Sequence, residues 1–480
     1  MQKRMRYDYL AWQKSEAEYE AWRDKLFEEN VLREIGQYLQ KHRGGVAKEL
    51  MNPTAGAFNV CLQMKFGDGG SAIIRFPQPG NIRFPEEKVR KEVAVMRFVA
   101  ENTLIPVPFV LHHGTAEEGP AGMGPFILME YVSHARNMTA ELNTPGFRRE
   151  DRPVLNPQIS EAKLKFAYGQ MAAVLLHLSR PGFAQIGSLE ELEDGDWSVT
   201  ERPMTFNMNE LVSLGNFPPA KLPSDVFQTS SSYFRALADT NLVHLSTQRN
   251  DAIESAEDCR RKYVARHLFR KIVSDGQFPS PPQPETKPFK LFCDDFRPSN
   301  VLVDEECKIV GVIDWEFSYV APAEYSYSPP WWLLIESPEE WLGGISDWVK
   351  EYEPRLRTFL GALKEREDIM IKDGTLREDQ RLSFRMKSSW ETGEFWMSYA
   401  ARKSWAFDTV FWELINTNPR YFDGNSGYEA GLEMLSEEER GGMEDFVRTK
   451  LEQSESQTLS SNNKEVEEEI EVEIRTGNWI

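Results

Sequence analysis

The sequence predicts an α+β protein of two lobes, a small sheet-rich N-lobe and a larger helical C-lobe. Three observations predict this fold. The chain has 480 residues, which is too long for a single compact core. Residues 46–132 contain short strand-like runs around one helix-like segment. Much of residues 133–450 carries apolar side chains at helical spacing, interrupted by loops rich in proline and serine.

The first 45 residues are expected to form a helical extension that precedes the N-lobe. Residues 5–42 place aromatic and aliphatic side chains mostly three or four residues apart, which is the spacing of one or two amphipathic helices. These side chains are Tyr9, Trp12, Tyr19, Trp22, Leu26, Leu32, Ile35 and Leu39. We interpret the extension as a packing element.

The N-lobe is assigned to residues 46–132. Residues 67–70 read Gly-Asp-Gly-Gly and predict a turn between two strands. The strand candidates begin at Asn59, Ser71, Val107 and Pro125. Residues 86–101 predict a helix, because Val89, Val93 and Met96 fall on one face of it. The result is a small sheet with one helix.

The C-lobe is assigned to residues 133–450, and an acidic, flexible tail to residues 451–480. Helical patterns occupy residues 162–178, 236–274, 331–341, 345–363 and 386–415. Residues 188–235 look irregular, and residues 300–313 predict a short β-hairpin. The tail is rich in glutamate, and its Ser- and Asn-rich part has a composition typical of disorder, whereas the final alternating IEVEIRTG run could form a strand instead.

The composition narrows the class of function. The formal net charge is −20, and an acidic surface argues against nucleic-acid binding, which depends on basic patches. Cys61, Cys259, Cys293 and Cys307 form no CxxC pair, so neither a disulfide framework nor a zinc site is expected. The first residues lack the apolar core of a signal peptide, and no run approaches 18 apolar residues. We therefore expect a cytoplasmic protein with no membrane partner.

Residues 291–316, LFCDDFRPSNVLVDEECKIVGVIDWE, carry the pattern that points to chemistry. A hairpin over residues 300–313 should bring Asn300 and Asp314 together at its open end, and Asp295 lies on the loop that enters the same end. Oxygen ligands at such a place suit Mg²⁺. A further carboxylate nearby can accept a proton from an attacking hydroxyl. The pattern therefore predicts phosphoryl transfer.

Each of these acids also has a structural interpretation. Asp294, Asp295 and Asp304 could be turn formers, and Asp314 could cap a loop. Taken singly, each residue favours that interpretation. The joint pattern favours the functional one, because Asn300 follows Asp295 by five positions and the hairpin ends in an apolar-Asp-Trp-Glu run.

The segment resembles the phosphotransferase motif of the aminoglycoside phosphotransferase family, whose members have a protein-kinase-like fold. The chain is most similar to the fungal branch of that family. The similar stretches are RPMTFNMNELVSLG, STQRNDAIESAEDCRRKYVARHLF, LFCDDFRPSNVLVD, GVIDWEFSYVAPAEY, PPWWLL and FDTVFW. The resemblance covers roughly residues 50–425. It implies a sheet-rich N-lobe that binds nucleotide and a helical C-lobe that holds the catalytic loop and the acceptor site.

The resemblance implies roles for the residues of the hairpin segment. Asp295 matches the catalytic Asp of the motif H-x-D-x-x-x-x-N, Asn300 matches its metal-binding Asn, and Asp314 matches the Asp of the second metal motif. Cys293 departs from the motif, because many members have a His there that supports the loop. Arg297, inside the loop, is a candidate for contacting the γ-phosphate or the acceptor, with a surface ion pair as the alternative.

A kinase also needs a cation on the nucleotide phosphates and an acid that holds this cation. Arg75 lies in the expected strand, and in branches of this family an Arg often replaces the expected Lys. Arg can still bind phosphate in bidentate fashion. Glu92 on the following helix is its expected partner, with an ordinary salt bridge as the alternative. Lys65 on the preceding strand is the weaker candidate cation.

The other nucleotide contacts are predicted from position. Residues 53–59 should form the loop that covers the phosphates, with Gly56 as its only glycine. The backbone groups of Glu130 and Val132 should contact the adenine base, with a plain strand end as the alternative. Glu316 and Glu324 could contact metal-bound water or a cationic substrate, although such residues are more often structural. Six tryptophans are interpreted as core: Trp331, Trp332, Trp390, Trp396, Trp405 and Trp412.

Together these expectations predict an ATP- and Mg²⁺-dependent kinase that phosphorylates a hydroxyl of a small-molecule acceptor. The alternative is a catalytically silent, kinase-like nucleotide-binding or scaffold protein, which Cys293, Arg75 and the single-glycine loop favour. A protein kinase ranks third, since no APE-like anchor follows Asp314. Members of the family also phosphorylate choline and sugars, so the identity of the acceptor stays open, as does the oligomeric state.

Overall fold

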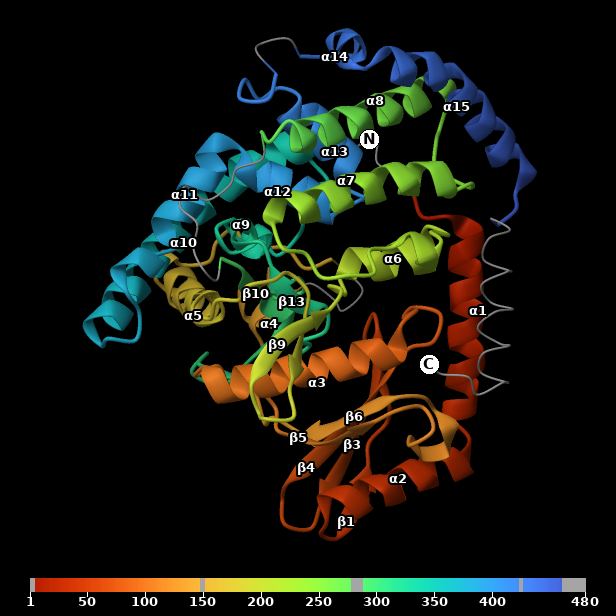
Figure 1. Ribbon diagram of the computed structural model, residues 1–480. Coiled ribbons are helices and arrows are strands. Elements are labelled where there is room, and N and C mark those ends of the chain that lie inside the picture. The colour runs from red at the N-terminus through yellow and green to blue at the C-terminus, as the bar shows by residue number, and fades with distance from the viewer. Residues whose placement is uncertain (1–4, 147–151, 278–287, 423–425, 460–480) are drawn as a thin grey trace.

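A computed structural model describes residues 5–146, 152–277, 288–422 and 426–459 (Figure 1). The N-lobe is built on a six-stranded sheet, and the C-lobe consists mainly of helices with small sheets among them. Figure 1 shows the N-lobe sheet at the bottom and the helices of the C-lobe above it. The predicted α+β fold of two lobes is confirmed. Within these residues, no helix combines the length and the hydrophobicity that a membrane span requires.

The N-lobe sheet has the strand order β1-β3-β4-β6-β5, and these neighbours pair antiparallel. Its strands are β1 (Ala47–Leu50), β2 (Thr54–Ala55), β3 (Asn59–Phe66), β4 (Ser71–Pro77), β5 (Val110–Gly114) and β6 (Phe126–Glu130). The short β2 pairs with the start of β3. The register places Arg75 of β4 between Cys61 of β3 and Ile127 of β6. Arg75 therefore lies at the centre of the sheet.

Helices cover both faces of this sheet. They are α1 (Tyr9–Leu26), α2 (Glu29–Arg43) and α3 (Pro85–Asn102). On one face, Val93 of α3 belongs to the same core as Ile127 of β6. On the other face, Ile35 of α2 shares a core with Leu62 of β3. Figure 1 shows α3 and α2 on opposite sides of the strands. The N-terminal extension is thus part of the N-lobe core, because without it one apolar face of the sheet would be open to water.

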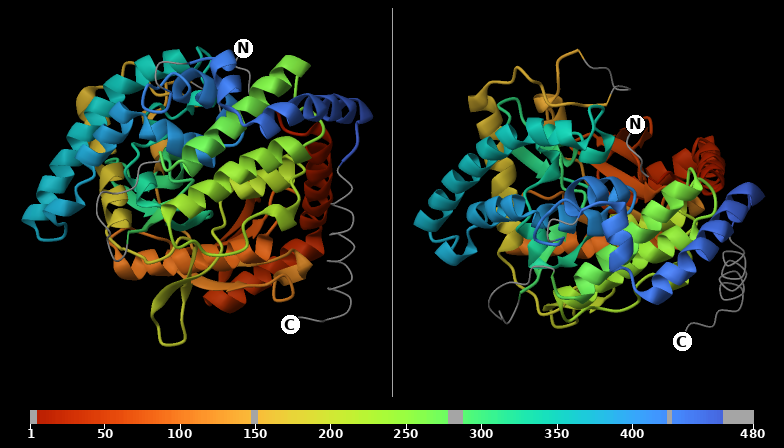
Figure 2. Two further views of the ribbon diagram at one scale, coloured as in Figure 1. Left: turned by 45° about the horizontal axis from the view of Figure 1, so that its top comes forward. Right: turned by 90° about the horizontal axis from the view of Figure 1, so that it is seen from above.

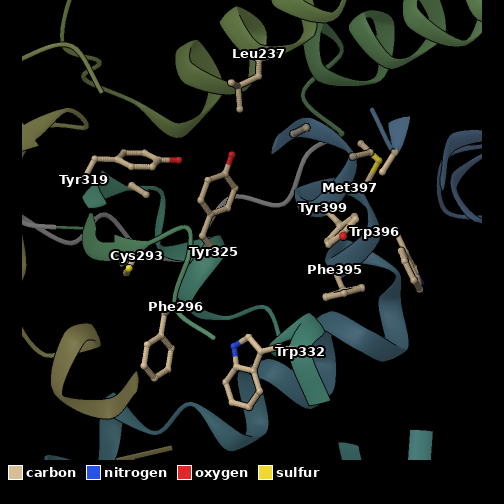
Figure 3. Close-up of a cluster of buried hydrophobic side chains, with 14 of the residues drawn as sticks. Leu237, Cys293, Phe296, Tyr319, Tyr325, Trp332, Phe395, Trp396, Met397 and Tyr399 are labelled. Atoms are coloured by element: carbon tan, nitrogen blue, oxygen red, sulfur yellow. The ribbon is translucent and has the colours of Figure 1, made fainter. Parts of the chain in front are cut away.

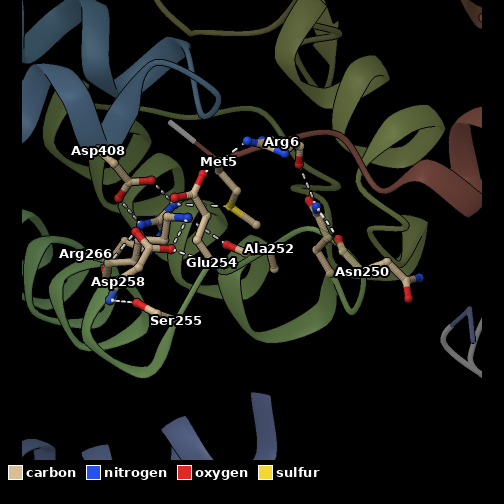
Figure 4. A network of polar contacts seen from close by, with 11 residues as sticks. Met5, Arg6, Asn250, Ala252, Glu254, Ser255, Asp258, Arg266 and Asp408 are labelled. Atoms are coloured by element: carbon tan, nitrogen blue, oxygen red, sulfur yellow. Dashed lines mark hydrogen bonds and ion pairs between the residues drawn. The ribbon is translucent and has the colours of Figure 1, made fainter. Parts of the chain in front are cut away.

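The segment that precedes α1 is attached to the C-lobe (Figure 4). The Asp8 carboxylate caps α1 and also accepts a hydrogen bond from the Asn250 Nδ2 at 3.0 Å. Gln248 donates to the carbonyl of Arg6 at 2.7 Å. Farther along, Ser15 of α1 donates to the carbonyl of Gly80 in the N-lobe at 2.5 Å. Helix α1 therefore contacts both lobes, and Figure 2 shows it along their common side.

The C-lobe contains most of the helices and three small sheets. Its helices are α4 (Met138–Leu142), α5 (Glu161–Ser179), α6 (Phe206–Leu214), α7 (Ser230–Thr247), α8 (Ala256–Ser274), α9 (Ala323–Ser326), α10 (Ile345–Lys372), α11 (Ser383–Thr392), α12 (Glu394–Arg402), α13 (Phe407–Val410), α14 (Tyr428–Met434) and α15 (Glu437–Ser456). Its strands are β7 (Arg136–Asn137), β8 (Ser188–Glu191), β9 (Trp197–Glu201), β10 (Lys290–Cys293), β11 (Val301–Val303), β12 (Ile309–Val312) and β13 (Ser318–Ala321). The sheets are β12-β11-β7, β10-β13 and β8-β9.

Several elements differ from the sequence-based expectation. The stretch expected to be irregular, residues 188–235, contains the hairpin β8-β9 and helix α6. The helix expected over residues 331–341 is two short 3₁₀ turns, because Pro338 interrupts it. The segment 386–415 divides at Gly393, whose φ of +82° ends α11. Helix α15 continues to Ser456, so the first residues of the predicted tail are helical. The tail from residue 460 lies outside the described residues.

Aromatic side chains form the core of the C-lobe beside the loop between β10 and β11 (Figure 3). Trp332 and Phe296 meet edge to face, with ring centroids 6.0 Å apart. Trp396 packs against Phe395 at 4.7 Å. Trp332, Trp396 and Trp405 are buried, and the half-buried Trp331, Trp390 and Trp412 pack against the same core. The structure thus agrees with the interpretation of these tryptophans as core.

Candidate active site

The hairpin β11-β12 positions two of the candidate residues. Val301 pairs with Val312, and the N–H of Ile313 donates to the carbonyl of Asn300 at 2.9 Å. Asn300 and Asp314 therefore flank the open end of the hairpin, as the sequence pattern predicted. The turn at the other end is fixed by Asp304, which accepts hydrogen bonds from two backbone N–H groups within the turn.

Asp295 lies on the loop between β10 and β11 and is held by two neighbours. Its Oδ2 accepts from the Asn300 Nδ2 at 2.9 Å, and its Oδ1 lies 3.0 Å from the Arg297 Nε. Burial raises the pKa of the Asp295 carboxyl, although Arg297 opposes this shift. A buried carboxylate with a raised pKa beside a loop arginine is suited to accept a proton from a hydroxyl.

Cys293 is the last residue of β10, and Asp294 follows it. Cys293 is buried opposite Ser318 of β13, and burial raises the pKa of its thiol well above the ordinary range. This Cys is therefore an uncharged part of the loop support. Asp294 accepts a hydrogen bond from Arg402 of α12 at 2.8 Å, so that it joins the loop to the C-lobe.

Asp314 follows β12 in the left-handed region, with φ of +56°. Its Oδ1 accepts a hydrogen bond from the Arg75 guanidinium at 2.7 Å, and Arg75 also pairs with Glu92 of α3. Burial raises the pKa of Asp314 to about 6. Arg75 opposes this rise, while the neighbouring carboxylates Glu316, Glu92 and Asp295 add to it. The structure thus brings together Arg75 and Glu92, which the sequence paired, and links both to Asp314.

The remaining candidates of the N-lobe lie elsewhere on the sheet. Gly56 begins the β2-β3 turn, where its N–H donates to the Asn59 carbonyl at 2.9 Å. A Cβ at Gly56 would meet its nearest atom at 3.8 Å, so the turn does not depend on glycine. Glu130 ends β6 and is exposed, and the Val132 carbonyl accepts from His134 at 2.8 Å. Lys65 pairs with Glu49 on the exposed edge of the sheet and does not reach the acids.

Sequence reasoning missed one buried cation of the site. Lys88 of α3 lies 2.5 Å from the Glu316 Oε2 and 3.4 Å from the Glu92 Oε2. Asn59 at the start of β3 accepts from Lys88 at 2.8 Å and donates to Glu316 at 2.8 Å. The available signal was the spacing of four residues between Lys88 and Glu92, which places both on the same helix face.

The residues at the hairpin end fit a divalent cation. Among the described residues, no cluster of three or more His, Cys, Asp or Glu side chains is arranged to hold a metal ion. Mg²⁺ does not need such a cluster, because it usually takes one or two protein carboxylates together with phosphate oxygens and waters. Asn300 turns its amide nitrogen to Asp295, which leaves its Oδ1 beside the Ser299 hydroxyl at 3.1 Å. The repulsion among the carboxylates around Asp314 would be relieved by a cation there.

The comparisons with known proteins agree with the resemblance read from the sequence. A family model described as the phosphotransferase enzyme family matches residues 211–359, which include the loop that carries Asp295, the hairpin and Asp314. The predicted resemblance is thereby confirmed. Clavilactone A biosynthesis cluster protein Y of Ampulloclitocybe clavipes is 25% identical over 292 residues, which are 59% of this chain and 63% of that protein. The chain thus spans less than two thirds of this relative.

Some solved structures are distantly similar to this chain, and the two described here are named as a phosphotransferase and a kinase. A thermostable mutant of an aminoglycoside phosphotransferase, in complex with AMP-PNP and hygromycin B, is 13% identical, with a TM-score of 0.40 over 86% of this chain and 98% of that chain. An ethanolamine kinase of Plasmodium vivax is 12% identical, with a TM-score of 0.41 over 91% of each chain. Likenesses this distant assign neither a substrate nor a residue role.

Proposed function

We propose that this protein is an ATP- and Mg²⁺-dependent phosphotransferase that moves the γ-phosphate to a hydroxyl of a small-molecule acceptor. One observation carries the proposal. Asp295, Asn300 and Asp314 converge at one end of a hairpin, and the ion pair of Arg75 and Glu92 reaches Asp314 from the N-lobe. Phosphoryl transfer needs this combination: an acid for the hydroxyl, oxygen ligands for the metal, and a cation for the phosphates.

The C-lobe residues divide the chemistry among them. Asp295 would accept the proton of the acceptor hydroxyl, and its raised pKa favours proton uptake. Asp314 and Asn300 would hold Mg²⁺, which neutralises charge on the transferred phosphate when it is bound. Arg297 would leave Asp295 and turn to the γ-phosphate or the acceptor, because its side chain is 40% exposed and its bond to Asp295 is a single ion pair.

The N-lobe residues would bind the nucleotide. Arg75 would exchange its contact with Asp314 for the phosphates while Glu92 keeps it in place. The loop of residues 53–59 would cover the phosphates, with Gly56 at its turn. The backbone groups of Glu130 and Val132 would contact the adenine base at the end of β6. The family match over residues 211–359 supports the proposal independently of these contacts.

A second candidate function is a nucleotide-binding protein that transfers nothing. The observation that favours it is the internal pairing of both acids, since Asp295 contacts Arg297 and Asp314 contacts Arg75. An active kinase must break these pairs when substrates bind, whereas a silent protein can keep them. The two candidates differ in turnover and not in fold.

The first test measures thermal unfolding with ATP, with and without Mg²⁺, for the wild type and for Asp314→Asn. A ligand at a hundred times its dissociation constant stabilises the native state by about 2.7 kcal/mol, which is a measurable shift. We expect a Mg²⁺-dependent shift in the wild type that is reduced in the variant. A screen of hydroxylated acceptors for ADP release then separates a kinase from a silent nucleotide-binding protein. No shift in either protein would refute nucleotide binding.

A further inference from the structure

Lys88 is a buried cation to which the proposed reaction gives no role. It lies near the start of α3 and is 2% exposed. Its ammonium contacts three side chains: Glu316 at 2.5 Å, Asn59 at 2.8 Å and Glu92 at 3.4 Å. These partners come from the segment after β12, from the start of β3 and from α3 itself. A buried charge with partners on three segments needs a reason, because taking an ammonium out of water is unfavourable.

Glu92 is shared between two cations. Its Oε1 pairs with Arg75, and its Oε2 faces Lys88. Each cation then reaches one acid of the segment Asp314-Trp315-Glu316: Arg75 contacts Asp314, and Lys88 contacts Glu316. The two carboxylates that could serve a metal therefore have one internal cation each.

The pairs Arg75–Asp314 and Lys88–Glu316 differ in the solvent exposure of their carboxylates. The Asp314 side chain is 31% exposed, whereas the Glu316 side chain is 4% exposed. Glu316 has a second donor, because the Asn59 Nδ2 bonds to the same Oε2 at 2.8 Å. An incoming cation can thus reach the Asp314 carboxylate directly. The Glu316 carboxylate, in contrast, is already neutralised by the Lys88 ammonium and hydrogen-bonded by the Asn59 amide.

On the basis of the proposed function, we propose that Lys88 is a positioning residue that withholds Glu316 from the metal. Its fixed charge balances Glu316, so that a divalent ion binds through Asp314 and Asn300 without a second acid from this segment. Its contact with Asn59 also fastens the base of the 53–59 loop to the metal segment. Lys88 of α3 thereby controls the metal affinity of the site.

The physical reason is competition between a tethered cation and a free one. A divalent ion that approached Glu316 would meet the like charge of Lys88 within a few ångströms, in a site poorly screened by water. Removing the ammonium while keeping the shape of the side chain should free the Glu316 carboxylate as a metal ligand. Lys88→Met makes this change, and Lys88→Arg is the matched control that keeps the charge.

The test measures Mn²⁺ affinity by electron paramagnetic resonance in the presence of a non-hydrolysable ATP analogue. We expect Lys88→Met to bind Mn²⁺ on the order of ten-fold more tightly than the wild type, with Lys88→Arg unchanged. The gain should vanish in the double variant Lys88→Met/Glu316→Gln, because it acts through the freed carboxylate. In the wild-type background, Glu316→Gln should change the affinity less than about two-fold, whereas Asp314→Asn should lower it about ten-fold or more.

The proposal is overturned if Lys88→Met leaves Mn²⁺ affinity unchanged or weakens it, or if the gain persists in the double variant. A loss in Glu316→Gln as large as that in Asp314→Asn would also overturn it, and this comparison holds even if Lys88→Met does not fold. The same measurement can contradict the proposed function without contradicting the role of Lys88. If the wild type binds no Mn²⁺ and Lys88→Met does, the role of Lys88 is supported and the metal-dependent kinase is contradicted. Absence of binding in every variant would refute both.

Discussion

The Asp294 carboxylate accepts a hydrogen bond from the Arg402 guanidinium at 2.8 Å, inside the C-lobe. Both side chains are buried. The next residue, Asp295, contacts Asn300 and Arg297 instead. Two adjacent carboxylates therefore have separate partners, one structural and one in the proposed catalytic site. This separation allows substitutions of neighbouring residues to distinguish folding from chemistry.

Asp294→Asn and Asp295→Asn should have opposite consequences. The first leaves Arg402 buried without a counter-charge and should lower the free energy of unfolding by about 3 kcal/mol. The second keeps the shape beside Asn300 but removes the proton acceptor, so ATP turnover with an acceptor should fall about 10²–10⁴-fold. Urea unfolding and turnover measured on both variants check the prediction. Equal losses of stability, or an active Asp295→Asn, would contradict the separation of roles.

Arg75 should contribute to both stability and nucleotide affinity. Its guanidinium joins Glu92 and Asp314, so Arg75→Met leaves Asp314 without its cation and Glu92 with Lys88 alone, and it should lower the free energy of unfolding by about 3 kcal/mol. Arg75→Lys keeps the charge, but one ammonium replaces a planar fork that bonds in two directions. It should therefore recover part of the stability and bind ATP more weakly than the wild type. If Arg75→Lys matches the wild type in both the free energy of unfolding and the affinity for ATP, the planar guanidinium is not needed at this position.

The candidate site was predictable where its parts are close in the sequence. Asn300 and Asp314 flank one hairpin whose turn is marked by Asp304, so alternation and turn chemistry place them together without knowledge of the tertiary structure. The pair of Arg75 and Glu92 was also predictable, because a strand followed by a helix fixes their relation. Local periodicity was sufficient for these contacts.

The rest depends on contacts between distant segments. Arg402 reaches Asp294 across 108 positions, and nothing near either residue marks the other. In the sequence, Lys88 looks like an ordinary surface lysine. It is buried because α3 packs against the segment after β12, and this contact cannot be read from the residues near Lys88. The hairpin β8-β9 was missed for another reason: its residues are largely polar and half-buried, so the apolar alternation of a strand is weak.

Glu324 should make stability depend on pH. It is 8% exposed, it accepts from the Ser230 hydroxyl at 3.2 Å, and its Oε1 has no hydrogen-bond partner among the described residues. Burial raises the pKa of Glu324 to about 7. The folded state therefore holds the proton more tightly than the unfolded chain. The resulting stabilisation is complete below the ordinary pKa of 4.5 and is lost as the pH rises through about 7.

The Glu324→Gln variant tests this dependence, because it keeps the shape and cannot ionise. At pH 8 the variant should be more stable than the wild type by on the order of 2 kcal/mol, and the difference should shrink toward pH 5. Urea unfolding at several pH values gives the comparison. Ser230→Ala is the control: it removes a donor to the carboxylate, so the pKa of Glu324 should rise further and the loss of stability should extend to higher pH than in the wild type. A difference that does not vary with pH would rule out titration of Glu324.

The contact of α1 with the N-lobe should depend on Gly80. Its φ is +81°, and a Cβ there would overlap the carbonyl oxygen of Ser15 in α1. Gly80→Ala combines an unfavourable backbone conformation with a steric clash against a helix, so it should lower the free energy of unfolding by about 2–4 kcal/mol. Gly69→Ala is the matched control, because Gly69 has a φ of +89° with nothing within 4 Å of the added Cβ. It should show only the backbone effect, about 1–2 kcal/mol.

Limited proteolysis measures whether the loss in Gly80→Ala comes from α1. This helix is held to the C-lobe through Asp8 and to the N-lobe through Ser15. If the clash at Gly80 displaces the helix, a protease should cleave α1 faster in Gly80→Ala than in Gly69→Ala. Both digestions are carried out without denaturant, and cleavage in the rest of the chain should proceed at the same rate in the two variants. Equal cleavage and equal unfolding energies in the two variants would mean that α1 can move away from the sheet without consequence. The extension would then be an appendage, and not the part of the core that its contacts indicate.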